Sequence, residues 1–263
     1  MPVVICTDLD RTLLDKDSCI HPQDKQILQT RQDIQFILAT GRPLHSVKKT
    51  FHKNGLFNDR PFPLALAGAN GSVTFLPGES LREYFPFAAS VRESIMDLTE
   101  RFRAVSWWFY EVDEVFVRWS SPFSDKIVED LDMTCKPFAS SDDHSRLSKI
   151  VAVSDDPGLL KEAGTAASCL PVDVMYGLGI LFELNPEGVN KGSGVRSLLP
   201  ALSNGARIFA AGDDENDLPL LSLAERSFCP VEANPRIRQM VDHVIDKTER
   251  GLLAPMLEQA GMA

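Results

Sequence analysis

The chain has 263 residues, of which 44% are hydrophobic and 24% are charged, and this composition excludes wholesale disorder. The formal net charge of -10 disfavours nucleic-acid binding through phosphate contacts, so an anionic substrate would need a local cluster of positive charge. Five scattered cysteines indicate neither a disulfide framework nor a CxxC-type zinc site.

The N-terminal region predicts a strand that stops at two acids. An apolar run over residues 3–6 is typical of a strand buried on both faces, and it leads into Asp8 and Asp10. Side chains alternate along an extended chain, so these two carboxylates can point to the same side. They repel each other unless a cation or a shared proton intervenes. Taken alone, the pair is equally well explained as an Asp-rich turn. The region has no signal-like pattern and no apolar span follows, so we expect a cytoplasmic protein without a membrane segment.

The next elements repeat this arrangement. A helix over residues 24–32 leads into a strand over 34–39, which ends at Thr40 and Arg42, and a helix over 44–54 follows. A third strand over 63–67 ends in a turn that contains Asn70, before a strand over 72–76.

The pattern changes between residues 79 and 184. A helix over 91–103 precedes two aromatic strands over 105–110 and 114–119; a polar region over 122–144 follows. A strand over 148–154, a helix from Pro157 and strands over 171–176 and 179–184 complete the segment. Hairpins with helices indicate an α+β insertion with an antiparallel sheet.

The remainder returns to alternating strands and helices. A helix over 191–202 precedes a strand over 207–211, and the acidic run that contains Asp213 and Asp217 follows that strand directly. A closing helix is expected near 252–259. The alternation on both sides of the insertion predicts an α/β core, formed by residues 1–78 and 185–263, with one doubly wound parallel sheet.

The carboxyl ends of parallel strands lie at one edge of a sheet, where ligands collect. That edge would gather four acids and a hydroxyl, with a lysine near a helix start: Asp8, Asp10, Asp213, Asp217, Thr40 and Lys191. Carboxylates without histidine or cysteine partners favour Mg²⁺. An Asp nucleophile, a neighbouring Asp, a hydroxyl and a lysine are the parts needed to move a phosphoryl group through an aspartyl-phosphate.

Four ordered stretches, DLDRTLL, ATGRP, the lysine of NPEGVNKG and GDDEND, resemble the motifs of the haloacid dehalogenase (HAD) superfamily of phosphatases. The resemblance is to the Cof-like branch with a type IIB cap, and it implies a Rossmann-like HAD core and a Mg²⁺ cofactor. It makes Asp8 the nucleophile and Asp10 the residue that protonates the leaving alcohol and then activates water. It implies that Mg²⁺ is bound by Asp8, by Asp213 and by the backbone carbonyl of Asp10, with Asp217 close by.

The same resemblance assigns phosphate binding to Thr40 and Lys191, helped by Asn216. Arg42 and Asn70 are possible substrate-binding residues, although a helix-start arginine and an Asn-Gly turn are also common structural features. The residue after Asp10 is usually glycine in this family, whereas here it is Arg11.

We therefore expect a Mg²⁺-dependent phosphatase that hydrolyses a small phosphorylated metabolite, such as a sugar phosphate. A phosphosugar mutase would use the same nucleophile, and a non-catalytic metabolite-binding protein would use the same fold, so both remain alternatives. The sequence does not indicate the oligomeric state.

Overall fold

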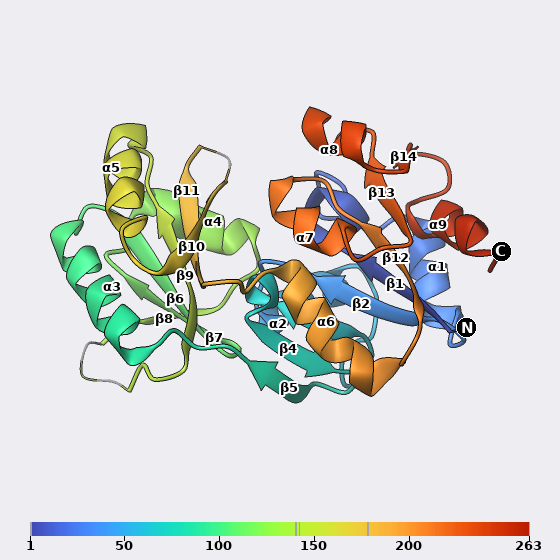
Figure 1. Cartoon of the computed structure of the whole chain (residues 1–263), viewed down its shortest axis with the longest axis horizontal. Coiled ribbons are helices and arrows are strands. Elements are labelled where there is room, and N and C mark those ends of the chain that lie inside the picture. Colours follow the sequence, from blue (N-terminus) through green and yellow to red (C-terminus); the bar gives the residue numbers. More distant parts are fainter. Residues whose placement is uncertain (1, 140, 142, 178, 263) are drawn as a thin grey trace. The chain divides into compact units, whose positions relative to one another are not determined.

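The computed structural model describes residues 2–139, 141, 143–177 and 179–262 (Figure 1). Its contacts divide the chain into two compact units. The first unit contains residues 1–41, 50–83 and 190–263, and the second contains residues 42–49 and 84–189. Residues 42–49, which the sequence grouped with the expected core, thus belong to the second unit by their contacts.

The first unit is built on an eight-stranded sheet with the order β14-β13-β12-β1-β2-β3-β4-β5. The six strands from β14 to β3 are parallel, and β4 runs antiparallel to β3. The predicted α/β class is confirmed, with an antiparallel edge added to the parallel sheet. The strand bounds are β1 (Val3–Thr7), β2 (Gln35–Ala39), β3 (Ala65–Gly68), β4 (Val73–Leu76), β5 (Ser80–Tyr84), β12 (Arg207–Ala211), β13 (Arg226–Pro230) and β14 (His243–Ile245).

The strands β1, β2 and β3 are buried on both faces, to which alternate residues of a strand point. Val4 and Ile37 face a core to which Val195 and Leu198 contribute. Ile5, on the other face, is also fully buried. The helices of this unit are α1 (Pro22–Thr30), α6 (Lys191–Leu202), α7 (Leu218–Leu221), α8 (Pro235–Met240) and α9 (Leu253–Ala260), together with the C-terminal part of α2 (Leu44–Lys53).

The helices α1 and α9 are joined by a buried carboxylate. Asp24 of α1 accepts hydrogen bonds from the backbone N–H groups of Leu252 and Leu253, at 2.9 and 2.8 Å, where α9 begins. These N–H groups have no partner within the helix, so Asp24 satisfies them in place of water.

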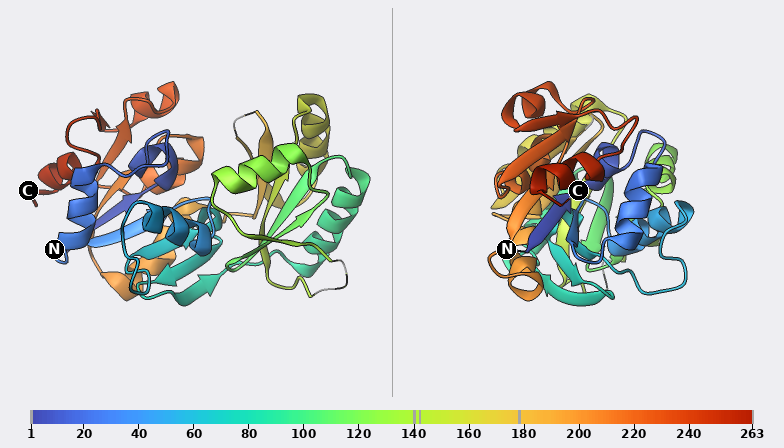
Figure 2. Two further views of the ribbon diagram at one scale, coloured as in Figure 1. Left: turned by 180° about the vertical axis from the view of Figure 1, so that it is seen from behind. Right: turned by 90° about the vertical axis from the view of Figure 1, so that its right-hand side faces the viewer.

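The second unit is built on a six-stranded sheet with the order β10-β11-β9-β6-β7-β8, antiparallel except between β7 and β8. Helices α3 (Ala89–Arg101) and α5 (Pro157–Ala167) lie over one face of this sheet (Figure 2). Trp107, Phe109 and Phe182 form a core on that face. The strands are β6 (Ser106–Glu111), β7 (Glu114–Arg118), β8 (Cys135–Pro137), β9 (Leu147–Val153), β10 (Val172–Gly177) and β11 (Leu181–Pro186).

The region over 122–144, for which no element was predicted, contains helix α4 (Pro122–Asp130) as well as β8. Proline at the first helical position and a reciprocal cap between Ser121 and Ser124 start this helix. No helix in the described part of the chain is both long and apolar enough to cross a membrane.

Candidate active site

The strands β12, β1 and β2 lie side by side in parallel and end at the same level. Thr7 at the end of β1 pairs with Ala211 on one side and with Leu38 on the other. The backbone N–H of Asp8 donates to the carbonyl of Ala211 at 2.9 Å, which fixes the first residue beyond the strand. The predicted gathering of Asp8, Thr40 and the acidic run after β12 at one sheet edge follows from this register.

Lys191 joins two of the predicted acids. Its Nζ donates to Oδ1 of Asp8 at 2.6 Å and to Oδ1 of Asp217 at 2.7 Å. The exposed fractions of these side chains are 3% for Lys191, 5% for Asp8 and 0% for Asp217. An ammonium is thus held between two carboxylates in a place that water hardly reaches.

The start of α6 places Lys191 there. Asn190 caps the helix by accepting from the N–H of Ser193, and the Ser193 hydroxyl accepts from the N–H of Asn190. Close backbone packing fixes the helix end, because a Cβ at Gly71 would lie 2.2 Å from the carbonyl oxygen of Asn190. Any side chain at Gly71 would therefore displace the turn that carries Lys191.

Asp217 uses both of its oxygens inside the protein. While Oδ1 accepts from Lys191, Oδ2 accepts from the backbone N–H groups of Asp213 and Asp214 at 2.9 and 3.1 Å. A Cβ at Gly212 would lie 2.4 Å from the Cβ of Asp217, so glycine is needed for this approach. Asp217 therefore orients Lys191 and the loop that presents Asp213.

Asp213 has a partner that the sequence did not indicate as functional. The buried hydroxyl of Thr12 donates to Oδ1 of Asp213 at 3.1 Å, across 201 residues of chain. The signal was present, since Thr12 is the threonine of the DLDRT stretch. It fixes the carboxylate of Asp213 beside the strand that carries Asp8.

Burial and mutual repulsion act on the protonation of these groups. Burial raises the pKa of Asp8 well above its ordinary value, and the charges of Asp217 and Asp213 add to this, while Lys191 opposes it. Burial and the charge of Asp217 raise the pKa of Asp213 to about 6. Burial alone would lower the pKa of Lys191, but Asp217 and Asp8 raise it above its ordinary value, so it stays charged. The acids outnumber the lysine, and added positive charge would stabilise their ionised forms.

The donor set suits a hard divalent cation. Asp8, Asp213 and Asp217 each bring one carboxylate oxygen within 4.8 Å of the others. Carboxylate oxygens are the ligands that Mg²⁺ prefers. Because both oxygens of Asp217 already bind protein groups, Asp8 and Asp213 are the better candidates for direct ligands. Asp10 is outside this group of three; it lies half-buried in the irregular turn after β1.

The remaining predicted residues are distributed over both units. Thr40 and Asn70 are buried, and the Asn70 N–H donates to the carbonyl of Thr40 at 2.9 Å, which brings the turn to the end of β2. Asn216 is half-buried in the 3₁₀ turn that contains Asp217. Arg42 belongs to the second unit, where its Nη1 donates to the carbonyl of Leu131 at 3.0 Å.

Arg11 takes the backbone conformation that favours glycine. Its φ is +61°, in the left-handed region, and its side chain is exposed. Lys247, which the sequence did not indicate, donates from Nζ to the carbonyls of Arg11, Thr12 and Leu14 at 2.8, 2.8 and 3.0 Å. These three bonds hold the turn after Asp10 in its irregular shape.

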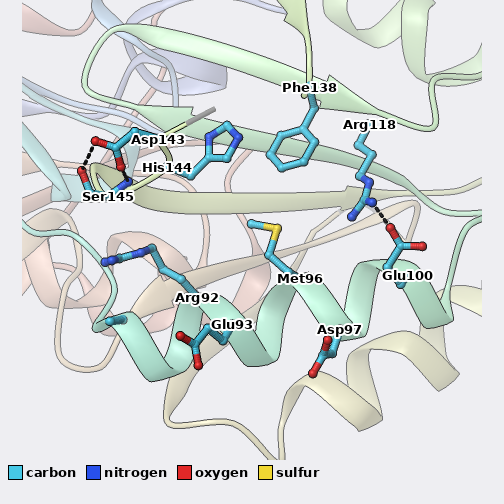
Figure 3. A pocket seen from close by; sticks show the side chains of 11 residues that line it. Arg92, Glu93, Met96, Asp97, Glu100, Arg118, Phe138, Asp143, His144 and Ser145 are labelled. Carbon is cyan, nitrogen blue, oxygen red and sulfur yellow. Dashed lines mark hydrogen bonds and ion pairs between the residues drawn. The ribbon is translucent and has the colours of Figure 1, made fainter. Parts of the chain in front are cut away.

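The second unit carries a hollow of its own, shown in Figure 3. Its volume is about 410 Å³, and it lies between α3 and the stacked rings of Phe138 and His144, whose centroids are 4.3 Å apart. None of the predicted site residues lines it. The chemistry expected from the sequence is therefore not located there.

A family model described as haloacid dehalogenase-like hydrolase matches residues 5–257, and the chain belongs to this family. This confirms the resemblance that the four motifs indicated. A solved structure of a subclass IIB sugar phosphatase of the HAD superfamily has the same fold, with a TM-score of 0.79 at 16% identity. The similarity covers 99% of this chain and 100% of that one.

Two curated relatives are similar in sequence. One is a glucosylglycerol-phosphate synthase from Pseudomonas anguilliseptica, 26% identical over 243 residues, which are 90% of this chain and 27% of the relative. The other is a phosphoglycolate phosphatase from Methanothermobacter thermautotrophicus, 33% identical over 102 residues, which are 38% of this chain and 44% of the relative. The chain thus spans less than half the length of either relative.

Proposed function

We propose that the chain is a Mg²⁺-dependent phosphatase that releases inorganic phosphate from a small phosphorylated metabolite through an aspartyl-phosphate at Asp8. The observation that carries this proposal is the buried Lys191, which joins Asp8 to Asp217 beside Asp213 at the carboxyl edge of a parallel sheet. Membership of a hydrolase family and the phosphatase among the relatives support it.

In the first step, a carboxylate oxygen of Asp8 forms a bond to phosphorus as the bond from phosphorus to the leaving oxygen breaks. Asp10 gives a proton to that oxygen, and the alcohol departs. In the second step, Asp10 takes a proton from water, whose oxygen attacks phosphorus. The bond from phosphorus to Asp8 then breaks and frees phosphate and the Asp8 carboxylate.

The transition state of each step spreads negative charge over the phosphoryl oxygens. The ammonium of Lys191, fixed by Asp217, is assigned to stabilise that charge, with Thr40 and Asn216 as further phosphate-binding residues. Mg²⁺, held by Asp8, Asp213 and the backbone carbonyl of Asp10, would supply positive charge to the same oxygens. Arg42 and Asn70 remain possible substrate-binding residues.

Residues 79–184 are proposed to act as a cap that decides the substrate, whereas residues 1–78 and 185–263 carry the chemistry. All the residues assigned to phosphoryl transfer lie outside 79–184, which motivates this division. A mutase or another phosphotransferase would use the same first step and differ only in the acceptor of the phosphoryl group.

Phosphate release from a panel of phosphorylated metabolites and from 4-nitrophenyl phosphate, with Mg²⁺ and with a chelator, tests the proposal. We expect release that depends on Mg²⁺ and is abolished in Asp8→Asn. Transfer of the phosphoryl group to a sugar, without free phosphate, would identify a mutase. Release that persists in the chelator would refute the metal assignment.

A further inference from the structure

The ammonium of Lys247 is bound by three backbone carbonyls of the first unit. Lys247 follows β14 and is half-buried, and its Nζ donates to the carbonyl oxygens of Arg11, Thr12 and Leu14 at 2.8, 2.8 and 3.0 Å. An ammonium has three protons, so these bonds use all of them. Carbonyl oxygens that replace water around a cation are also the ligands of K⁺ in proteins. These three carbonyls, here called the carbonyl cradle, thus have the chemistry of a monovalent cation site.

The turn that forms the carbonyl cradle is unfavourable without a cation. Three carbonyl oxygens that point to one place carry like partial charges, which repel each other unless a positive charge lies between them. Arg11 also has a φ of +61°, in the left-handed region, where a residue with a Cβ is strained and a glycine is not. The bond from Lys247 to the carbonyl of Arg11 stabilises this conformation. The shape of the turn therefore depends on the charge that Lys247 supplies.

The same turn carries groups that are assigned to the chemistry. Asp10, assigned to proton transfer, directly precedes Arg11 in the chain. On the other side of Arg11, the hydroxyl of Thr12 donates to Oδ1 of Asp213 at 3.1 Å. A change in the shape of the turn would therefore move Asp10 and, through Thr12, also Asp213. Misplacing a catalytic group by about 1 Å can lower a rate by about 10²-fold.

We propose that Lys247 is a positioning residue that supplies the cation of the carbonyl cradle, and that K⁺ can take its place. The inference rests on the proposed phosphatase function and adds to it the residue that holds Asp10 in position for proton transfer. Lys247 acts through the turn and is assigned no contact with the substrate. Because its ammonium is part of the chain, the wild-type protein needs no monovalent ion. Its activity should be the same in KCl and in tetramethylammonium chloride, whose cation is too large for the carbonyl cradle.

The experiment measures phosphate release by Lys247→Ala in these two salts at equal ionic strength. This substitution removes the ammonium and leaves room for an ion. In tetramethylammonium chloride we expect kcat to fall by about 10²-fold, with KM changed by less than about twofold, because the turn and not substrate binding is altered. Replacing that salt by KCl should raise kcat by about tenfold or more, and the increase should saturate with K⁺ concentration.

Two further variants separate the carbonyl cradle from general effects of salt and charge. Lys247→Met keeps most of the length of the side chain but not its charge, so it should be as slow as Lys247→Ala and should not respond to KCl. Lys16→Ala removes an exposed ammonium close to the same turn in the chain, and it should keep wild-type activity in both salts. A rate of wild-type size in folded Lys247→Met would overturn the inference, and so would an equal response of both Lys247 variants to KCl.

Unfolding temperatures, measured without substrate and in a chelator of divalent ions, test the cation site apart from the chemistry. KCl should raise the unfolding temperature of Lys247→Ala by about 2 °C or more over that in tetramethylammonium chloride, and it should not do so for Lys247→Met or the wild type. If Lys247→Ala folded in neither salt, or folded without any response to KCl, the carbonyl cradle would not accept K⁺ and the inference would be wrong. If the wild-type protein released phosphate from no ester, the proposed function would fail, whereas these temperatures would still decide on the cation site.

Discussion

Replacing Lys191 by methionine should destabilise the metal-free protein strongly. The substitution removes an ammonium that lies 2.6 and 2.7 Å from the buried carboxylates of Asp8 and Asp217. The carboxylate of Asp213 remains, with one oxygen within 4.8 Å of an oxygen of each of these two. At an effective dielectric constant of about 20, each contact is worth roughly 6 kcal/mol before the desolvation of the charges is subtracted. Removing one partner of a buried ion pair typically costs about 3–5 kcal/mol, which we take as the expected loss.

The loss should depend on pH in a defined direction. Without the lysine, the pKa of Asp8 should rise further, so the protein can relieve the repulsion by binding a proton as the pH falls. The destabilisation is then largest above that pKa and smaller below it. Unfolding temperatures measured in a chelator at pH 8 and pH 5 test this, with the exposed Lys16→Met as the control. We expect a decrease of roughly 10 °C at pH 8 and a smaller one at pH 5.

Mg²⁺ should restore part of the stability of Lys191→Met, because a bound cation would replace some of the lost charge. The rate of phosphate release should stay about 10²–10³ lower even with Mg²⁺, since an ion at another position does not replace the donor to the phosphoryl oxygens. Equal unfolding temperatures of variant and wild type in the chelator at pH 8 would refute the charge argument.

Three further predictions concern single carboxylates. Asp8→Asn should abolish turnover and leave the circular dichroism spectrum unchanged, since an amide is a poor nucleophile; near wild-type phosphate release would exclude the covalent step. Asp213→Ala should raise the Mg²⁺ concentration needed for half-maximal activity, because one ligand is lost. In the wild-type protein this concentration should increase as the pH falls below about 6, where Asp213 takes up a proton that competes with the metal. A requirement independent of pH between 5 and 7 would contradict the assignment of Asp213 as a ligand. Asp24→Ala should cost about 2–3 kcal/mol in urea unfolding, because two buried N–H groups at the start of α9 lose their acceptor; a loss below about 1 kcal/mol would mean that water replaces the carboxylate.

The fold was largely predictable because its strands carry a strong local signal. Five strands of the core, predicted from distinct apolar or alternating runs, appear close to their expected positions, at β1, β2, β3, β4 and β12. Helix α4 was not predicted, because its polar residues leave only a weak apolar periodicity. Ser121 and Pro122 nevertheless mark its start. The assignment of residues 42–49 to the second unit depends on tertiary contacts such as that of Arg42 with Leu131, which no local pattern encodes.

Some residues of the candidate site could likewise be named from the sequence, and others could not. The acids and Lys191 could be named because each follows a strand or starts a helix, and parallel strands bring such positions together. The role of Thr12 was signalled only by its place in the DLDRT stretch, and Lys247 had no local signal, since their partners lie 201 and up to 236 residues away along the chain. Their side chains act on a carboxylate and on backbone carbonyls, and such contacts have no sequence pattern of their own.

Asp217 shows how the structure adds to a role suggested by residue type. By sequence it is one more acid of the run after β12, expected close to the metal. In the structure its two oxygens bind Lys191 and the N–H groups of Asp213 and Asp214. A carboxylate used in this way holds the lysine in place and keeps it charged. Two buried acids and a half-buried one surround a single buried lysine, an excess of acids that stability alone would not favour and that a bound cation would balance. On the proposed function, this excess of acids would hold the metal, and Asp217 would fix the lysine that completes the charge balance around the phosphoryl group.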